Sequence, residues 1–239
     1  MNKYLLPSNY WRFIQHTYFP TCKKSYSDRG EDLIISAFFK KVGIVKPAYI
    51  DVGTHHPIYA NNTYYFYKRG SAGACIEPNP DMHRKIQSKR RRDICLNVGV
   101  SNEEHVALSY YVLSATTRNT FNKNEADRLV QSGFCTLTKQ IKIPVTTLER
   151  IIEENFANTC PDFISIDTEG YDLRVIQSID LAKHRPALFC IETLAYHPDG
   201  REYKSGEVTE YLKEKNYLVY ADTHVNTIFV DSGLYSAGR

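Results

Sequence analysis

Residues 48–54 read Ala-Tyr-Ile-Asp-Val-Gly-Thr, and this stretch is the clearest sign of the fold. Its first five residues are apolar apart from Asp51, as in a strand that is buried on both faces, and Gly53 ends the run. Further short apolar runs occur at residues 72–76, 93–98, 163–166 and 187–191. Because helical patterns separate these runs, we predict an α/β fold with a mostly parallel central sheet and helices on both faces.

Two pairs of residues mark helix starts, and two runs mark the end of the sheet. Asp28 with Glu31, and Thr146 with Glu149, have the spacing of a capping box. The closing runs, at 217–220 and 226–230, are joined too tightly for a helical crossover. We therefore expect an antiparallel terminal strand pair.

The chain shows no repeat, low-complexity tract or linker, so residues 1–239 are predicted to form a single domain. Residues 1–26 are rich in aromatic side chains without a clean period, and we expect them to pack as an N-terminal arm on the core or on a partner subunit. Residues 106–146 are less regular and are interpreted as an insertion on the acceptor side.

Composition narrows the class of protein. A net charge of +3 is too mild to indicate a nucleic-acid-binding protein. No apolar run is long enough to cross a bilayer, and the first residues lack the pattern of a secretion signal. The six cysteines include no C-x-x-C pair, which argues against a disulfide scaffold or a zinc site. We expect a cytoplasmic protein.

One basic run stands out at residues 89–92 (Lys-Arg-Arg-Arg). A solvated helix end is the plainer interpretation, because cations there face the negative end of the helix dipole. A patch for an anionic substrate or a membrane surface is the alternative, so peripheral membrane contact stays open.

Polar residues follow five of the predicted strands: Asp51, Glu77, Asn97, Asp167 and Glu192. The carboxyl ends of parallel strands meet at one edge of the sheet, and ligands bind beyond that edge. Carboxylates that gather there repel one another unless a ligand or metal compensates them. The sequence therefore predicts a binding site at this edge.

The turn after the first strand indicates the ligand. A nicotinamide site uses G-x-G-x-x-G so that the backbone can approach a pyrophosphate. Residues 51–57 hold one glycine, and Asp51 suits a positively charged amino group instead. Glu77, after the second strand, can hold two ribose hydroxyls. An amino acid joined to a nucleoside without phosphate describes S-adenosylmethionine.

Several ordered motifs resemble FkbM-type methyltransferases. They are residues 51–57 with 62–64 and 66–70, then 76–80, 97–101 and 166–170, with weaker similarity at 26–32 and 226–230. The resemblance implies a Rossmann-like class I methyltransferase fold and O-methylation, often of sugars or polyketide-like hydroxyls. From the strand ends and these motifs together, the predicted cofactor-binding residues are Asp51, Gly53, Thr54, Asn62, Glu77, Pro78, Asn97, Val98 and Asp167.

Asp167, Glu192 and His197 are the predicted catalytic residues. A sugar hydroxyl is a poor nucleophile, so a base that removes its proton should help the attack. Asp167 is the first choice for that base, and orientation of the cofactor's amino group is its alternative role. Glu192 and His197 could bind substrate or share proton transfer. With Asp167 they could also form a divalent metal site, which is not favoured.

Three further interpretations concern Glu169, the histidine pair at 55 and 56, and residues 119–121. Glu169 either caps the following helix or serves as the base. His55 and His56 are expected to pack their loop, with one near the cofactor. Residues 119–121 (Asn-Thr-Phe) are a candidate acceptor-side or adenine-side element.

The predicted function is an S-adenosylmethionine-dependent O-methyltransferase that acts on a sugar hydroxyl of a nucleotide sugar, glycan or polysaccharide. Its partner would be a small-molecule or glycan acceptor rather than a nucleic acid. Two alternatives remain, a non-catalytic S-adenosylmethionine-binding partner subunit and a nucleic-acid methyltransferase. The latter rests only on residues 89–92. A homo-oligomer is left open.

Overall fold

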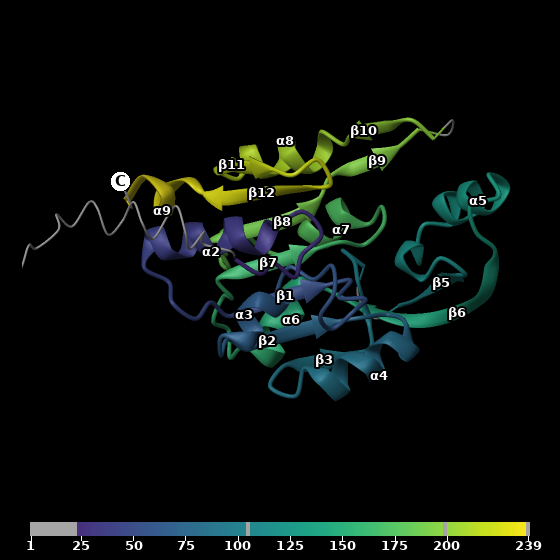
Figure 1. The fold of residues 1–239 in the computed structure, drawn as a ribbon, viewed down its shortest axis with the longest axis horizontal. Coiled ribbons are helices and arrows are strands. Elements are labelled where there is room, and N and C mark those ends of the chain that lie inside the picture. The colour runs from purple at the N-terminus through teal and green to yellow at the C-terminus, as the bar shows by residue number, and fades with distance from the viewer. Residues whose placement is uncertain (1–22, 104–105, 198–199, 238–239) are drawn as a thin grey trace, which may run out of the picture.

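A computed structural model describes residues 23–103, 106–197 and 200–237, and its centre is a seven-stranded sheet (Figure 1). The strands are β1 (Tyr49–Val52), β2 (Gly73–Ile76), β3 (Ile94–Leu96), β7 (Phe163–Ile166), β8 (Leu188–Glu192), β11 (Tyr217–Asp222) and β12 (Asn226–Asp231). Their order across the sheet is β3-β2-β1-β7-β8-β12-β11. The predicted arm at residues 1–26 lies mostly outside the described residues.

Strand directions confirm the predicted sheet. β1 pairs in parallel with β2 on one side and β7 on the other, and β7 continues in parallel to β8. β12 alone is reversed, since it runs antiparallel to both β8 and β11. The fold is therefore Rossmann-like, with the antiparallel terminal pair that the short connection predicted.

Helices cover both faces of the sheet (Figure 1). They are α2 (Glu31–Val42), α3 (Tyr64–Lys68), α4 (Pro80–Lys89), α6 (Leu148–Asn155), α7 (Asp172–Ile176), α8 (Glu207–Glu214) and α9 (Ser232–Ala237). One apolar cluster joins α6, α7 and α8 to the sheet, and a second joins α2, α3 and α9. In β1, Ile50 packs in the first cluster and Tyr49 in the second, because successive side chains point to opposite faces.

The insertion forms a small layer of its own at the carboxyl edge (Figure 1). It contains β5 (Ala107–Leu113), the 3₁₀ turn η1 (Thr116–Arg118), α5 (Lys123–Gln131) and β6 (Leu137–Thr146). β6 pairs antiparallel with β5 and in parallel with β4 (Gly99–Val100), which ties the insertion to the core.

Two predicted capping boxes are wrong. The residue before α2 is Gly30, with a left-handed φ of 88° and no side-chain cap, while Asp28 pairs with Arg29 instead. The cap of α6 is Thr147, whose side chain accepts from the Arg150 N–H, because Thr146 still belongs to β6. Sequence spacing found both helices but placed their starts imprecisely.

The basic run does not form a uniformly solvated helix end. Lys89, Arg91 and Arg92 are exposed, but Arg90 is fully buried. Its Nε lies 2.7 Å from Asp93 Oδ2, and both side chains have zero exposure. Arg90 is therefore part of the core, and a surface patch can include only its three neighbours.

Within the part of the chain that is described, no helix is both long and apolar enough to cross a membrane. The five cysteines in that part are all unpaired.

Candidate active site

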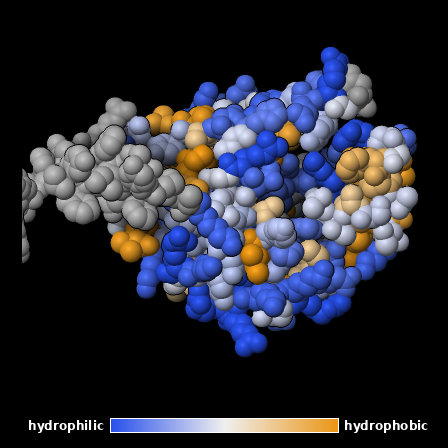
Figure 2. All heavy atoms as spheres, viewed as in Figure 1, coloured by the Kyte–Doolittle hydropathy of each residue, from blue (hydrophilic) through white to orange (hydrophobic). Residues whose placement is uncertain are grey.

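A cavity of about 370 Å³ opens at the carboxyl edge of the sheet. Its walls come from the turns after β1, β2, β7 and β8, and from the insertion. In Figure 2 the surface is hollowed between the insertion and the hairpin of β9 (Leu194–Tyr196) and β10 (Glu202–Lys204). The volume falls in the range of small-molecule sites. The sequence did not predict this hairpin, because each strand is three residues long and shows no apolar alternation.

Gly53 carries the chain from β1 into this cavity. Its φ is +78°, and a Cβ at this position would lie 1.8 Å from the Asp167 carbonyl oxygen. A side chain is thus excluded by both backbone conformation and space. Thr54 lines the cavity beside Gly53 and donates its hydroxyl to the Asp51 carbonyl at 2.8 Å. Asn62 also lines the cavity and donates to Ser165 Oγ at 3.1 Å.

Asp51 does not lie among the lining residues, although the sequence placed it against the cofactor. Its carboxylate is 4% exposed and accepts from Asn61 Nδ2 at 2.9 Å and Thr63 Oγ1 at 2.7 Å. Burial raises the pKa of Asp51, while the nearby Arg90 opposes that shift. The side chain therefore braces the loop that follows β1, and its contact with an amino group is not supported.

Glu77 ends β2 with its carboxylate buried beside the cavity. Its two oxygens accept from the N–H groups of His55 and Asn79, each at 2.8 Å. Burial raises the pKa of Glu77 to about 7. Each carboxylate oxygen keeps a second lone pair, so the group can still accept from ligand hydroxyls.

Pro78 and Val98 line the cavity next to Glu77, whereas Asn97 does not. Asn97 Nδ2 donates to the carbonyls of Glu77 and Pro78 at 2.8 and 2.9 Å. Asn97 therefore positions the turn that carries Glu77 and Pro78, and it does not itself face the cavity.

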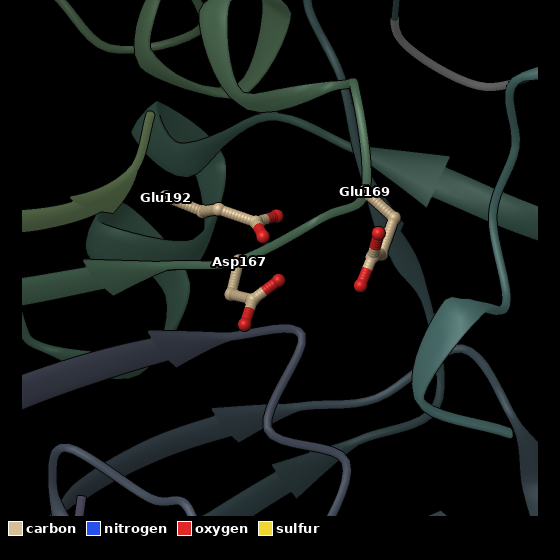
Figure 3. A group of neighbouring side chains, drawn as sticks. All are labelled: Asp167, Glu169 and Glu192. Carbon is tan, nitrogen blue, oxygen red and sulfur yellow. The ribbon is translucent and has the colours of Figure 1, made fainter. Parts of the chain in front are cut away.

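Three carboxyl groups meet where the cavity reaches β7 and β8 (Figure 3). One oxygen each from Asp167, Glu169 and Glu192 lies within 4.8 Å of the others. Asp167 immediately follows β7, and Glu192 is the last residue of β8. Glu169 lies in the loop after β7 with a left-handed φ of 52°. The predicted convergence of strand-end acids is confirmed for Asp167 and Glu192, and Glu169 joins them.

Proton affinity differs within this cluster. Burial, followed by the charge of Asp167, raises the pKa of Glu192 well above its ordinary value. Asp167 is exposed to the cavity, and its pKa is raised by desolvation and by the charge of Asp172, while Glu192 opposes that rise. Like charges this close cannot all ionise freely. The cluster therefore binds protons more tightly than isolated carboxyl groups do.

Arg118 was missed by the sequence interpretation. Its Nη1 lies 2.8 Å from Glu169 Oε2 and 4.0 Å from Glu192 Oε1. Its Nη2 lies 3.3 Å from the Tyr196 hydroxyl. The residue immediately precedes the 119–121 segment that the sequence marked, but no local pattern distinguishes it from a surface arginine.

The segment 119–121 itself belongs to the cavity wall. Asn119 and Phe121 line it, and Thr120 Oγ1 donates to the Glu169 carbonyl at 2.8 Å. His55 also lines the cavity, while His56 packs its loop by accepting N–H groups from Ile58 and Tyr59.

The family model of the methyltransferase FkbM domain matches residues 51–219. The chain belongs to the FkbM methyltransferase family. It is an S-adenosylmethionine-dependent methyltransferase in class, and the matched range contains every residue of the acid cluster. No curated protein matches the chain.

Solved structures that are similar to this methyltransferase include three at about one-tenth identity. A TehB-like SAM-dependent methyltransferase from Corynebacterium glutamicum has 11% identity and a TM-score of 0.43, covering 93% of this chain and 95% of its own. The Burkholderia thailandensis 1,6-didemethyltoxoflavin-N1-methyltransferase has 11% identity, a TM-score of 0.40 and coverage of 97% and 93%. The O-methyltransferase from Bacillus cereus has 11% identity, a TM-score of 0.37 and coverage of 93% and 89%.

His197 does not join the acid cluster of this methyltransferase. It is exposed just beyond β9, and its ring packs against Tyr203 at a centroid distance of 4.4 Å. It is absent from the residues that line the cavity. The predicted oxygen/imidazole metal site is therefore not assembled, and His197 is not supported as a catalytic residue.

The carboxyl cluster offers only oxygen ligands, which suit hard cations such as Mg²⁺. However, the Arg118 guanidinium already pairs with Glu169 and approaches Glu192. The cluster is thus partly neutralised by the protein itself, and its residues do not fit a resident metal ion well.

Proposed function

We propose that this methyltransferase moves a methyl group from S-adenosylmethionine to a hydroxyl of a sugar, with Asp167 as the base. The observation that carries the proposal is the pair of strand-end carboxyl groups, Asp167 and Glu192, at the inner end of the cavity. In this proposal Glu192 holds a proton and Asp167 accepts the proton of the acceptor hydroxyl.

The residues that line the cavity match the ribose and the base of the cofactor. Glu77 offers carboxylate lone pairs to a ribose diol, and His55 fixes that carboxylate through its backbone N–H. Val98 and Phe121 supply apolar surface for a base. No described basic side chain meets Glu77, which suits a nucleoside without phosphate. S-adenosylmethionine, when bound, supplies an activated methyl group on a sulfonium.

Three residues then prepare the acceptor oxygen. Asp167 accepts the hydroxyl proton, and the protonated Glu192 stabilises the Asp167 carboxylate by a hydrogen bond. Arg118 pairs with Glu169 and opposes the effect of burial, which raises the pKa of Glu169 to about 8. Most of the rate gain would come from holding the acceptor in line with the methyl carbon.

The insertion at residues 106–146 belongs to the acceptor side in this proposal. It delivers Arg118 to the acid cluster and places Tyr110 and Phe121 over the cavity. A small core of its own, built from Tyr111, Leu113 and Leu129, keeps the insertion folded beyond the sheet.

The proposal is tested by transfer of a labelled methyl group from S-adenosylmethionine to a panel of sugars, glycans and nucleotide sugars. We expect label in an alkali-stable ether, which distinguishes O-methylation of a hydroxyl from ester formation. Label that appears only in amines, or only in nucleic acid, would refute the proposal even if the cofactor binds.

A further inference from the structure

A second cavity, of about 260 Å³, lies beside the first. The two cavities share five lining residues, namely Arg118, Glu169, Glu192, Leu194 and Tyr196. Two members of the acid cluster, Glu169 and Glu192, thus belong to a common wall between the cavities, whereas Asp167 lines the first cavity alone. Nothing in the proposed cofactor site uses the far side of that wall.

From this arrangement we infer that the second cavity is the acceptor site, and that it selects an uncharged sugar over a phosphorylated or carboxylated one. The inference rests on the proposed function and narrows its acceptor. An acceptor in this cavity would approach the Asp167–Glu192 pair from the side opposite to the nucleoside. A hydroxyl of that acceptor would reach past Glu192 into the first cavity, where it would meet the base Asp167 and the methyl group.

Charge in the second cavity carries the selectivity. Five acids are among its described lining residues, and they are Glu125, Glu169, Asp172, Glu192 and Glu207. Arg118 is the one basic residue in that described lining, and Glu169 already pairs with it. Glu125 pairs with Arg128, and Glu192 holds a proton in the proposed function. Asp172 and Glu207 are then the acids that a phosphate or uronate would meet as like charges, which disfavours its binding.

Nearby cations are also engaged by other acids. Arg128 Nε donates to Glu125 Oε2 at 2.8 Å. Lys204 lies next to lining residue Ser205, but its Nζ pairs with Asp222 Oδ1 at 2.9 Å and donates to Thr193. Neither is free to compensate an anionic acceptor without losing an existing partner.

Two tyrosines give the cavity an aromatic surface. Tyr196 and Tyr203 come from the paired strands β9 and β10, and both line it. The Tyr196 ring is flanked by the guanidinium groups of Arg118 and Arg128, at 5.3 and 5.5 Å from its centroid. Aromatic rings next to acids and amides form a surface that stacks on the C–H face of a pyranose and accepts from its hydroxyls. Asn122, which also lines the cavity, adds an amide.

The test compares methyl transfer to neutral methyl hexosides, to their matched uronic acids and to their 6-phosphates. We expect kcat/KM for the best neutral hexoside to exceed that of its charged counterparts by at least about tenfold. Glu207→Lys should reduce that ratio by about fivefold or more, because it adds positive charge to the cavity. Glu214→Lys, at the exposed end of the same helix and outside the lining, should leave the ratio unchanged.

Stacking is tested at Tyr203, which is 43% exposed and can be changed without opening the core. Tyr203→Ala should raise the acceptor KM by about fivefold or more, with unchanged affinity for S-adenosylhomocysteine, and Tyr203→Phe should restore the KM. Three results would overturn this inference and leave the proposed function intact. They are equal use of charged and neutral hexosides, the same response to both lysine variants, and an unchanged acceptor KM for Tyr203→Ala. Transfer to no hexoside of any charge would contradict the proposed function together with it.

Discussion

The Arg118 guanidinium lies 2.8 Å from the Glu169 carboxylate and thereby joins the insertion to the loop after β7. This ion pair is largely shielded, since the two side chains are 26% and 13% exposed. It links two residues that are 51 positions apart in sequence, at the point where both cavities meet. The charge of Arg118 also lowers the pKa of Asp167 and of Glu169 against the effect of burial.

Removal of that charge should move the pH profile. Arg118→Met leaves the carboxyl groups without their cation, so the pKa of Asp167 rises further. Because Asp167 must be ionised to accept a proton, the acid limb of kcat should shift to higher pH, and activity at pH 6 should fall more than at pH 8. Arg118→Lys keeps a charge and should shift the limb less. Parallel profiles for wild type and Arg118→Met would show that the guanidinium does not act on the base.

Asp167→Asn tests the base directly. We expect kcat to fall by about 10²–10⁴-fold, because an amide cannot accept the hydroxyl proton. Binding of S-adenosylhomocysteine, measured by calorimetry, should change little, since Asn keeps the shape of the side chain. Lost cofactor binding with intact turnover would instead assign Asp167 to orientation of the amino group.

Glu192 offers a matched pair of variants. Gln can donate a hydrogen bond to Asp167 as the protonated carboxyl does, whereas Ala cannot. Glu192→Gln should therefore keep kcat within about tenfold of wild type, and Glu192→Ala should lose about tenfold more than Glu192→Gln. If the Gln variant is as inactive as the Ala variant, the ionised form of Glu192 is the one that matters.

The buried pair of Arg90 and Asp93 lies outside the cavity lining, and we expect it to stabilise the fold. Arg90 also donates to the hydroxyls of Tyr49 and Thr63 at 3.0 and 2.9 Å, so it anchors the loop after β1. Arg90→Met should lower the free energy of unfolding by about 3–5 kcal/mol, because Asp93 is left buried without its cation. Arg91→Met, at an exposed position, should change it by about 0.5 kcal/mol or less. Urea unfolding curves measure both, and equal midpoints would contradict this assignment.

Much of the sheet was predictable because each strand is a short apolar run with a polar residue at its end. β7 was found at its observed bounds, 163–166, since its four residues are all buried and apolar or small. The caps of α2 and α6 were misplaced, because a capping-box spacing in sequence does not reveal which residue begins the helix. The helix α9 and the β9–β10 hairpin carry too little apolar periodicity to be recognised.

In the site, the strand-end rule found Glu77, Asp167 and Glu192, whose positions follow from topology alone. It could not show that Asp51 turns away from the cavity, because that depends on hydrogen bonds from Asn61 and Thr63. Arg118 reaches the acids through the tertiary placement of the insertion, which no local pattern encodes. His197 was predicted to be catalytic because it is close to Glu192 in sequence. Strand β9 separates the two residues and places His197 outside the cavity lining.

The pH dependence of cofactor binding follows from Glu77. Ribose hydroxyls that donate to its carboxylate would favour the ionised form and lower a pKa that is about 7 in the free protein. Affinity for S-adenosylhomocysteine should therefore weaken as pH falls below 7, by at most about tenfold per pH unit, and binding at pH 7 should release protons. Calorimetry in buffers with different ionisation enthalpies would detect the release. Proton uptake would contradict this role for Glu77.

Calorimetric titration with S-adenosylhomocysteine, in parallel with NADH, tests the central claim most directly. One molecule of S-adenosylhomocysteine should bind per chain, Glu77→Leu should weaken that binding by about tenfold or more, and NADH should not bind. The opposite outcome is that S-adenosylhomocysteine gives no binding heat at concentrations up to about 1 mM and leaves the melting temperature unchanged. That result would contradict the assignment of this cavity to a phosphate-free sulfonium nucleoside.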